Sequence, residues 1–65
     1  MIHFHIQNEG TVLLLRPLTE SAREWVAESI SPEHQEFAGA VVVEHRYISD
    51  IMQGIVAEGM GYAFR

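Results

Sequence analysis

Residues 40–48 have the sequence AVVVEHRYI, and the spacing of apolar residues changes within this stretch. The three consecutive valines predict a buried strand, because β-branched side chains pack well on a pleated sheet that is covered on both faces. From about His45 onward the apolar residues recur at helical spacing and predict a second helix. The residues on its apolar arc are Ile48, Ile51, Met52, Ile55 and Val56. The chain should therefore pass directly from a strand into a helix, and Gly59 is placed to end that helix as a left-handed C-terminal cap.

Toward the N-terminus, the sequence predicts a β-hairpin followed by a first helix. Apolar residues alternate with histidines from Ile2 to Ile6, Asn8–Gly10 supplies turn residues, and Thr11–Leu15 is strongly β-prone. Thr19 is a good N-cap, so a helix should run from about Glu20 to Ile30. A two-stranded unit is thus expected before the first helix.

Two shorter segments complete the expected order. Ser31-Pro32-Glu33 predicts a short turn of helix before Phe37, since proline is favoured at a first helical position. Tyr62–Phe64 alternates again and predicts a short final strand. The order β-β-α-β-α-β predicts an α+β fold, a small two-layer sandwich with two helices packed on one face of a three- to four-stranded sheet. Residues 1–65 should form a single domain, and the strand order stays open, although both helical connections are long enough for parallel crossovers.

The composition favours a small folded protein that gains stability from a second chain. A chain of 65 residues has no cysteine for a disulfide and buries only about 60% of its unfolded surface on folding, so we expect oligomerisation. Nine acidic residues against four arginines give a net charge of −5, which disfavours direct nucleic-acid binding. The longest apolar runs have the length of strands, and the N-terminus lacks the pattern of a signal peptide. We therefore expect no membrane contact and a cytoplasmic location.

Two histidines near the N-terminus raise the question of a metal site. His3 and His5 are two apart on a strand, so their side chains should project from the same face. A third ligand would have to come from His34, His45 or a carboxylate, and nothing in the spacing requires one. We therefore expect neither a metal nor a cofactor, and we place both histidines on an exposed or interfacial face of the sheet.

The junction of the third strand with the second helix is the candidate for catalysis. Glu44, His45 and Arg46 lie there, at a place where catalytic groups often gather in α/β folds. Glu44 is also explained by the electrostatics of a helix N-terminus, and adjacent side chains do not point the same way. The sequence contains no nucleophile-elbow serine, no Gly-rich phosphate loop and no cysteine, which predicts a non-enzymatic protein.

The two helices carry the candidate partner-binding residues. Glu20, Glu24 and Glu28 are spaced by four, which stacks three carboxylates on one helix face at a cost of roughly a few tenths of a kcal/mol per pair. Such a stripe is suited to a basic partner, and a merely solvated acidic face is the alternative. Trp25 and Tyr47 lie at the edges of the two apolar arcs, where they either anchor a partner or close the rim of the core.

A glycine inside the second helix indicates a close approach. Gly54 costs about 1 kcal/mol relative to alanine within a helix. It falls beside Tyr47 and Glu58, so we expect another backbone to come close there.

The apolar content of the strands predicts a homodimer that is joined through the sheet. The second and third strands are apolar on both faces, yet helices on one side cover only one of each alternating set. The other set would face water, which monomers rarely allow for a large apolar patch. The sequence does not fix which face is covered. We assign the interface to His3, His5, Leu13, Leu15 and Val42.

A set of spaced residues in the second half of the chain carries a resemblance. It consists of Val43-Glu44-His45-Arg46-Tyr47, followed by Asp50, Gly54 and Glu58-Gly59-Met60, after a helix that bears a tryptophan. This pattern resembles a class of short uncharacterised proteins from proteobacteria and their prophages, over most of the chain from Thr19 onward. Phe37 departs from the class, which would have another tryptophan there, and the motif assigns no catalytic residue. The resemblance implies a small mobile-element protein, and such proteins often bind and block or redirect a host protein.

The expected function follows from the acidic surface and this resemblance. We expect a non-enzymatic protein-binding module that inhibits a host defence or regulatory complex, whose nucleic-acid groove the acidic surface would mimic. The alternative is a structural homo-oligomer with no outside catalytic or ligand role. A small-molecule or metal-binding domain comes third. The sequence names neither the partner nor the pathway.

Overall fold

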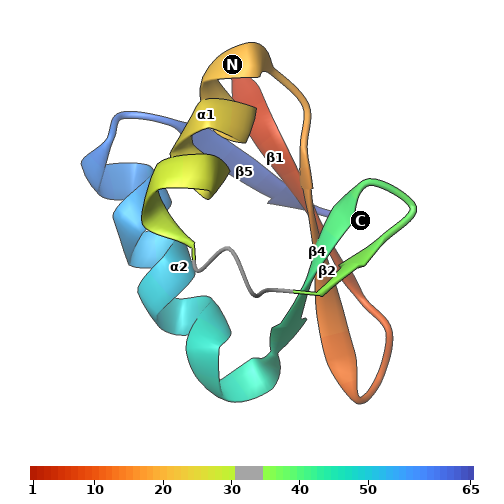
Figure 1. The fold of residues 1–65 in the computed structure, drawn as a ribbon. Helices are drawn as coiled ribbons and strands as arrows, with labels where there is room; N and C mark the ends of the chain where they lie inside the picture. The colour runs from red at the N-terminus through yellow and green to blue at the C-terminus, as the bar shows by residue number, and fades with distance from the viewer. Residues whose placement is uncertain (31–34) are drawn as a thin grey trace.

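Two helices cover one face of a five-stranded sheet in the computed structural model, which describes residues 1–30 and 35–65 (Figure 1). The elements in chain order are β1 (Ile2–Asn8), β2 (Val12–Pro17), α1 (Glu20–Ser29), β3 (Glu36–Phe37), β4 (Ala40–Glu44), α2 (His45–Ala57) and β5 (Gly61–Phe64). The strands stand in the order β3-β4-β2-β1-β5. The predicted α+β two-layer sandwich is confirmed, with one more strand than expected. Among the described residues, no helix is both long and apolar enough to cross a membrane.

The additional strand is β3, which forms a hairpin with β4. Glu36 pairs with Val41 and Phe37 with Ala40, and the two residues between them both have positive φ, 51° at Ala38 and 81° at Gly39. Positive φ at both central residues is the geometry of a type I′ turn, whose twist matches that of the flanking strands. The short helical turn expected at Ser31-Pro32-Glu33 lies outside the described residues.

The hairpin between β3 and β4 also decides the direction of the strands. It reverses the chain after α1, so β4 pairs antiparallel with β2. β3, the strand that α1 leads into, is antiparallel to β4 and therefore runs parallel to β2, with β4 between them in the sheet. After α2 the chain reaches the opposite edge of the sheet, where β5 pairs parallel with β1. β1 and β5, from opposite ends of the described chain, are therefore neighbours (Figure 1).

Local signals set the ends of both helices as predicted. The hydroxyl oxygen of Thr19 accepts a hydrogen bond from the N–H of Ala22 at 3.1 Å, which caps the N-terminus of α1. The second helix begins directly after β4, and Gly59 follows it with a φ of 75°. His45, its first residue, donates from Nε2 to the carbonyl oxygen of Gly10 at 2.8 Å and ties the helix to the β1–β2 loop.

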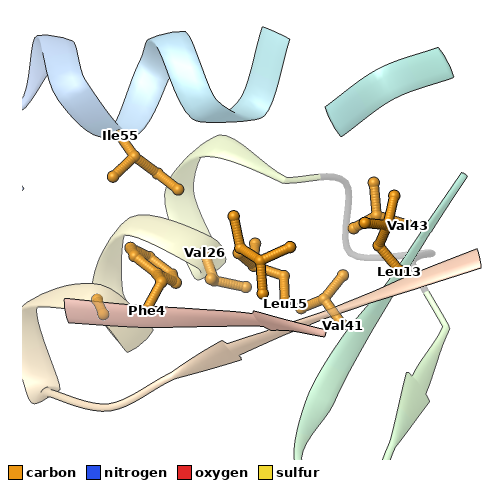
Figure 2. Close-up of a cluster of buried hydrophobic side chains, with 9 residues drawn as sticks. Phe4, Leu13, Leu15, Val26, Val41, Val43 and Ile55 are labelled. Atoms are coloured by element: carbon orange, nitrogen blue, oxygen red, sulfur yellow. The ribbon is translucent and has the colours of Figure 1, made fainter. Parts of the chain in front are cut away.

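The core lies between the helices and one alternating set of strand residues (Figure 2). In the sheet, Ile6 is in register with Leu15 and Leu13 with Val43, so these side chains share the face that the helices cover. The buried cluster consists of Phe4, Ile6, Leu13, Leu15, Ala22, Val26, Val41, Val43 and Ile55. The other alternating set, which includes Leu14 and Val42, faces away from the helices.

Candidate functional site

An acidic hollow lies between α1 and the end of α2. It has a volume of about 450 Å³ and is lined by Glu24 and Glu28 from α1 and by Glu58 from the C-terminal cap of α2. We call it the acidic hollow. The three carboxylate residues are exposed, so each can meet a ligand from solution. The remaining lining residues are His3, Ser21, Trp25, Ser29, Gly59 and Met60.

Trp25 forms a wall of the acidic hollow and also closes the core. Its indole is half-buried and lies edge-on against Phe4, with ring centroids 5.8 Å apart and an interplanar angle of 77°. On its other side is α2, where a Cβ atom at Gly54 would stand 3.0 Å from Cζ2 of the indole. The close approach expected at Gly54 is therefore made by the side chain of Trp25 and not by another backbone.

The remaining partner-binding candidates do not join this group. Glu20 is exposed on the first turn of α1 but does not line the acidic hollow, and Tyr47 lies at the other end of α2. The guanidinium carbon of Arg46 stands 4.8 Å from the centre of the Tyr47 ring, and Nε of Arg46 lies 3.3 Å from a carboxylate oxygen of Glu44. Tyr47 is thus an exposed aromatic residue that stacks with a cation of its own chain.

The two N-terminal histidines differ in their contacts. The register between β1 and β5 is irregular between Ile2 and Phe4, and Nδ1 of His3 accepts a hydrogen bond from the N–H of Gly61 at 3.3 Å. His5 is instead in register with Arg16, and its Nδ1 is buried without a hydrogen-bond partner among the described residues. The two imidazoles therefore have different hydrogen-bond surroundings.

Side chains that could bind a metal do not converge elsewhere in the described part of the chain. Within residues 1–30 and 35–65, no three histidine or carboxylate side chains form a group that could hold a metal ion. His45 is bonded to the carbonyl of Gly10, and Glu44 and Arg46 are exposed and paired with each other. The residues of the strand–helix junction therefore make structural contacts. His34, a possible third ligand in the sequence, lies outside the described residues.

The set of residues assigned to a dimer interface changes in the structure. Leu13 and Leu15 lie in the core beneath the helices, because they are in register with core residues of β1 and β4. A second chain that packs on the open face of the sheet would meet Leu14 and Val42 instead. That face is also less open than expected, since Leu14 is only 6% exposed and Ala40 is fully buried.

Two of the large apolar side chains that remain exposed lie in the two edge strands of the sheet. Phe37 in β3 is 65% exposed and Phe64 in β5 is 60% exposed. Val56 of α2 is 60% exposed. It lines a hollow together with Tyr62 of β5. Edge strands with free backbone groups are the usual sites of pairing with another chain.

Comparison of the chain with models of protein families, with curated proteins and with solved structures found no match.

Proposed function

We propose that this chain is a non-enzymatic protein-binding module whose acidic hollow receives basic side chains of a partner. The observation that carries the proposal is the convergence of Glu24 and Glu28 of α1 with Glu58 of the α2 C-terminal cap, on a hollow with an aromatic wall. An arginine side chain in this hollow would form charge-assisted hydrogen bonds to a carboxylate and stack its guanidinium on the indole of Trp25. Both interactions favour arginine over a neutral side chain.

The partner in this proposal is a complex with a basic surface that normally contacts nucleic acid. A net charge of −5 directs the chain to such a surface and accelerates the encounter. The resemblance to short mobile-element proteins adds the biological role, which is inhibition of a host defence or regulatory complex. In this role the carboxylates of α1 take the place of phosphates in the groove of the partner.

A short arginine-rich peptide is a defined probe of the acidic hollow. Trp25 is the sole tryptophan of the chain, so its fluorescence reports binding in the hollow directly. We expect the peptide to change the Trp25 emission and the double variant Glu24→Gln/Glu28→Gln to weaken its binding about tenfold at low salt. The difference should shrink as salt is added, because exposed charges are screened.

A matched control separates the hollow from the overall charge. Glu9→Gln/Asp50→Asn changes the net charge by the same amount at two exposed positions outside the hollow. This variant should bind the peptide nearly as well as the wild type. If both double variants weaken binding equally, only the net charge of the chain matters. If Glu24→Gln/Glu28→Gln leaves binding unchanged, the row of carboxylates on α1 is merely a solvated acidic face.

The fold should survive these substitutions. Glu24→Gln removes the repulsion of Glu24 with Glu20 and with Glu28, each worth roughly a few tenths of a kcal/mol, so α1 should become slightly more stable. A loss of peptide binding in the double variant Glu24→Gln/Glu28→Gln should then reflect the hollow and not unfolding. Urea denaturation followed by circular dichroism checks this point.

A homodimer is the second part of the proposal. A chain of this size has a small core, and exposed apolar residues at the edges of its sheet offer further burial between two copies. Light scattering at micromolar concentration should give twice the chain mass. If the chain self-associates but binds no basic probe, the alternative role of a structural homo-oligomer without an outside partner is favoured.

A further inference from the structure

β5 presents an open backbone edge. It stands at the end of the strand order and, within the described residues, pairs with β1 alone. The N–H of Arg65 donates to the carbonyl oxygen of Ile6 at 2.9 Å, so the odd-numbered residues at this end of the chain direct their backbone groups toward β1. Backbone groups alternate in direction along a strand, and those of Tyr62 and Phe64 therefore point to the open edge.

The side chains along this edge are apolar and incompletely covered. Tyr62 and Phe64 lie on the helix side of β5 with their rings edge-to-face, 6.0 Å between centroids, and Phe64 is 60% exposed. Next to Tyr62 is a hollow of about 410 Å³. Its other lining residues come from α2 and are Ser49, Met52, Gln53, Val56 and Ala57.

We propose that this edge pairs antiparallel with β5 of a second copy, about a twofold axis at Ala63. The inference rests on the proposed homodimer and names its interface. In this register Tyr62 of each chain lies opposite Phe64 of the other, and each pair exchanges two backbone hydrogen bonds. All the outward N–H and C=O groups of both four-residue strands then have partners.

Antiparallel registers with the twofold axis moved by one residue leave more backbone N–H and C=O groups without partners. A twofold axis at Tyr62 would bring Met60 into the ladder, and the N–H of Met60 is already bonded to the carbonyl oxygen of Ile55 at 3.1 Å. An axis at Phe64 would leave Tyr62 opposite no residue of β5. The axis at Ala63 also places two small side chains opposite each other on the outer face, which suits the closer spacing of a non-hydrogen-bonded pair.

The shape and charge of the edge fit a second copy of this chain. Phe64 of the partner would stand beside Tyr62 on the helix side, at the mouth of the hollow that Met52 and Val56 line. Two copies with a net charge of −5 repel each other, and β5 carries no carboxylate. Arg65, which follows the strand, would lie opposite Gly61 of the partner, so like charges do not meet in the ladder.

Amide hydrogen exchange of the wild-type chain tests the register without any variant. In a concentration series from monomer to dimer, the N–H groups of Tyr62 and Phe64 should become protected by about tenfold or more. The N–H of Ala63, which points to β1, should change far less. If a dimer forms but the Tyr62 and Phe64 amides exchange as fast in the dimer as in the monomer, the inference is overturned.

A pair of matched variants tests the side chains. Phe64→Glu should give a monomer in light scattering, whereas Phe37→Glu, the same substitution at the opposite edge, should leave the dimer intact. A dimer that survives Phe64→Glu but is lost in Phe37→Glu or Val42→Glu would place the interface elsewhere and overturn the inference while the homodimer stands. A wild-type monomer would overturn both, and the binding of basic peptides would be unaffected. If Phe64→Glu does not fold, as judged by circular dichroism, the exchange experiment decides.

Discussion

Ala38 shows how a single residue can hold a turn at a conformational cost. Among the described residues other than glycine, it alone has a positive φ, 51°. The left-handed region costs an L-residue with a Cβ about 1 kcal/mol or more, and asparagine or glycine tolerates it better. Arg16 supports the turn, because its Nη1 donates to the carbonyl oxygen of Ala38 at 2.6 Å.

We therefore expect Ala38→Asn to raise the free energy of unfolding by about 1 kcal/mol, since Asn-Gly is the preferred sequence of a type I′ turn. Ala38→Val should lower it, because a β-branched side chain is least tolerant of positive φ. Urea denaturation of the two variants measures both effects. A stabilising valine or a neutral asparagine would show that this turn is not strained.

At the scale of elements, α1 and α2 meet through one indole and one glycine. Trp25 fills the space that Gly54 leaves open, and its edge-to-face contact with Phe4 holds it from the other side. The ring therefore cannot move far without the loss of an aromatic contact. This explains why a residue that costs about 1 kcal/mol in a helix stands in the middle of α2.

Gly54→Ala should consequently destabilise the chain by about 1 kcal/mol, because the overpacking against Trp25 outweighs the gain in helix propensity. The displaced indole should also change its fluorescence emission. Gln53→Ala, an exposed neighbour on the same helix, is the control and should leave the emission unchanged. A more stable Gly54→Ala variant would mean that Trp25 moves aside freely.

Local signals predicted the elements better than the contacts between them. Thr19 and Gly59 marked helix ends because capping acts within a few residues of the chain. β3 was missed, since a two-residue strand has no period to detect and depends on its pairing with β4. The strand order likewise depends on pairings between distant residues that periodicity does not reveal.

The sites were predictable to the extent that they lie on one element. The spacing of Glu24 and Glu28 placed them on one face of α1, whereas Glu58 and His3 join them only through the packing of α2 and β1. The assignment of Leu13 and Leu15 to an interface overlooked a usable signal. Arg16 belongs to the other alternating set of β2, and a charged residue marks the set that faces away from the core.

At the scale of the whole molecule, the two proposed surfaces belong to different elements. The acidic hollow takes its carboxylates from α1 and the end of α2, and the open edge belongs to β5. A dimer about the edge would therefore carry two acidic hollows. A partner with two basic sites at a matching distance would then be bound more tightly than one with a single site.

The parallel pairing of β1 with β5 determines how the molecule resists mechanical force. Residue 1 precedes β1 and residue 65 follows β5, so a pull on these residues acts along both strands in opposite directions and loads their hydrogen bonds in shear. A pull on residues 9 and 65 starts at the same end of the two strands and separates the bonds one after another. Because the chain has no cysteine, paired cysteines at these positions provide unique handles for single-molecule stretching. The first geometry should unfold at a clearly higher force than the second, and equal forces would mean that the β1–β5 ladder does not limit forced unfolding.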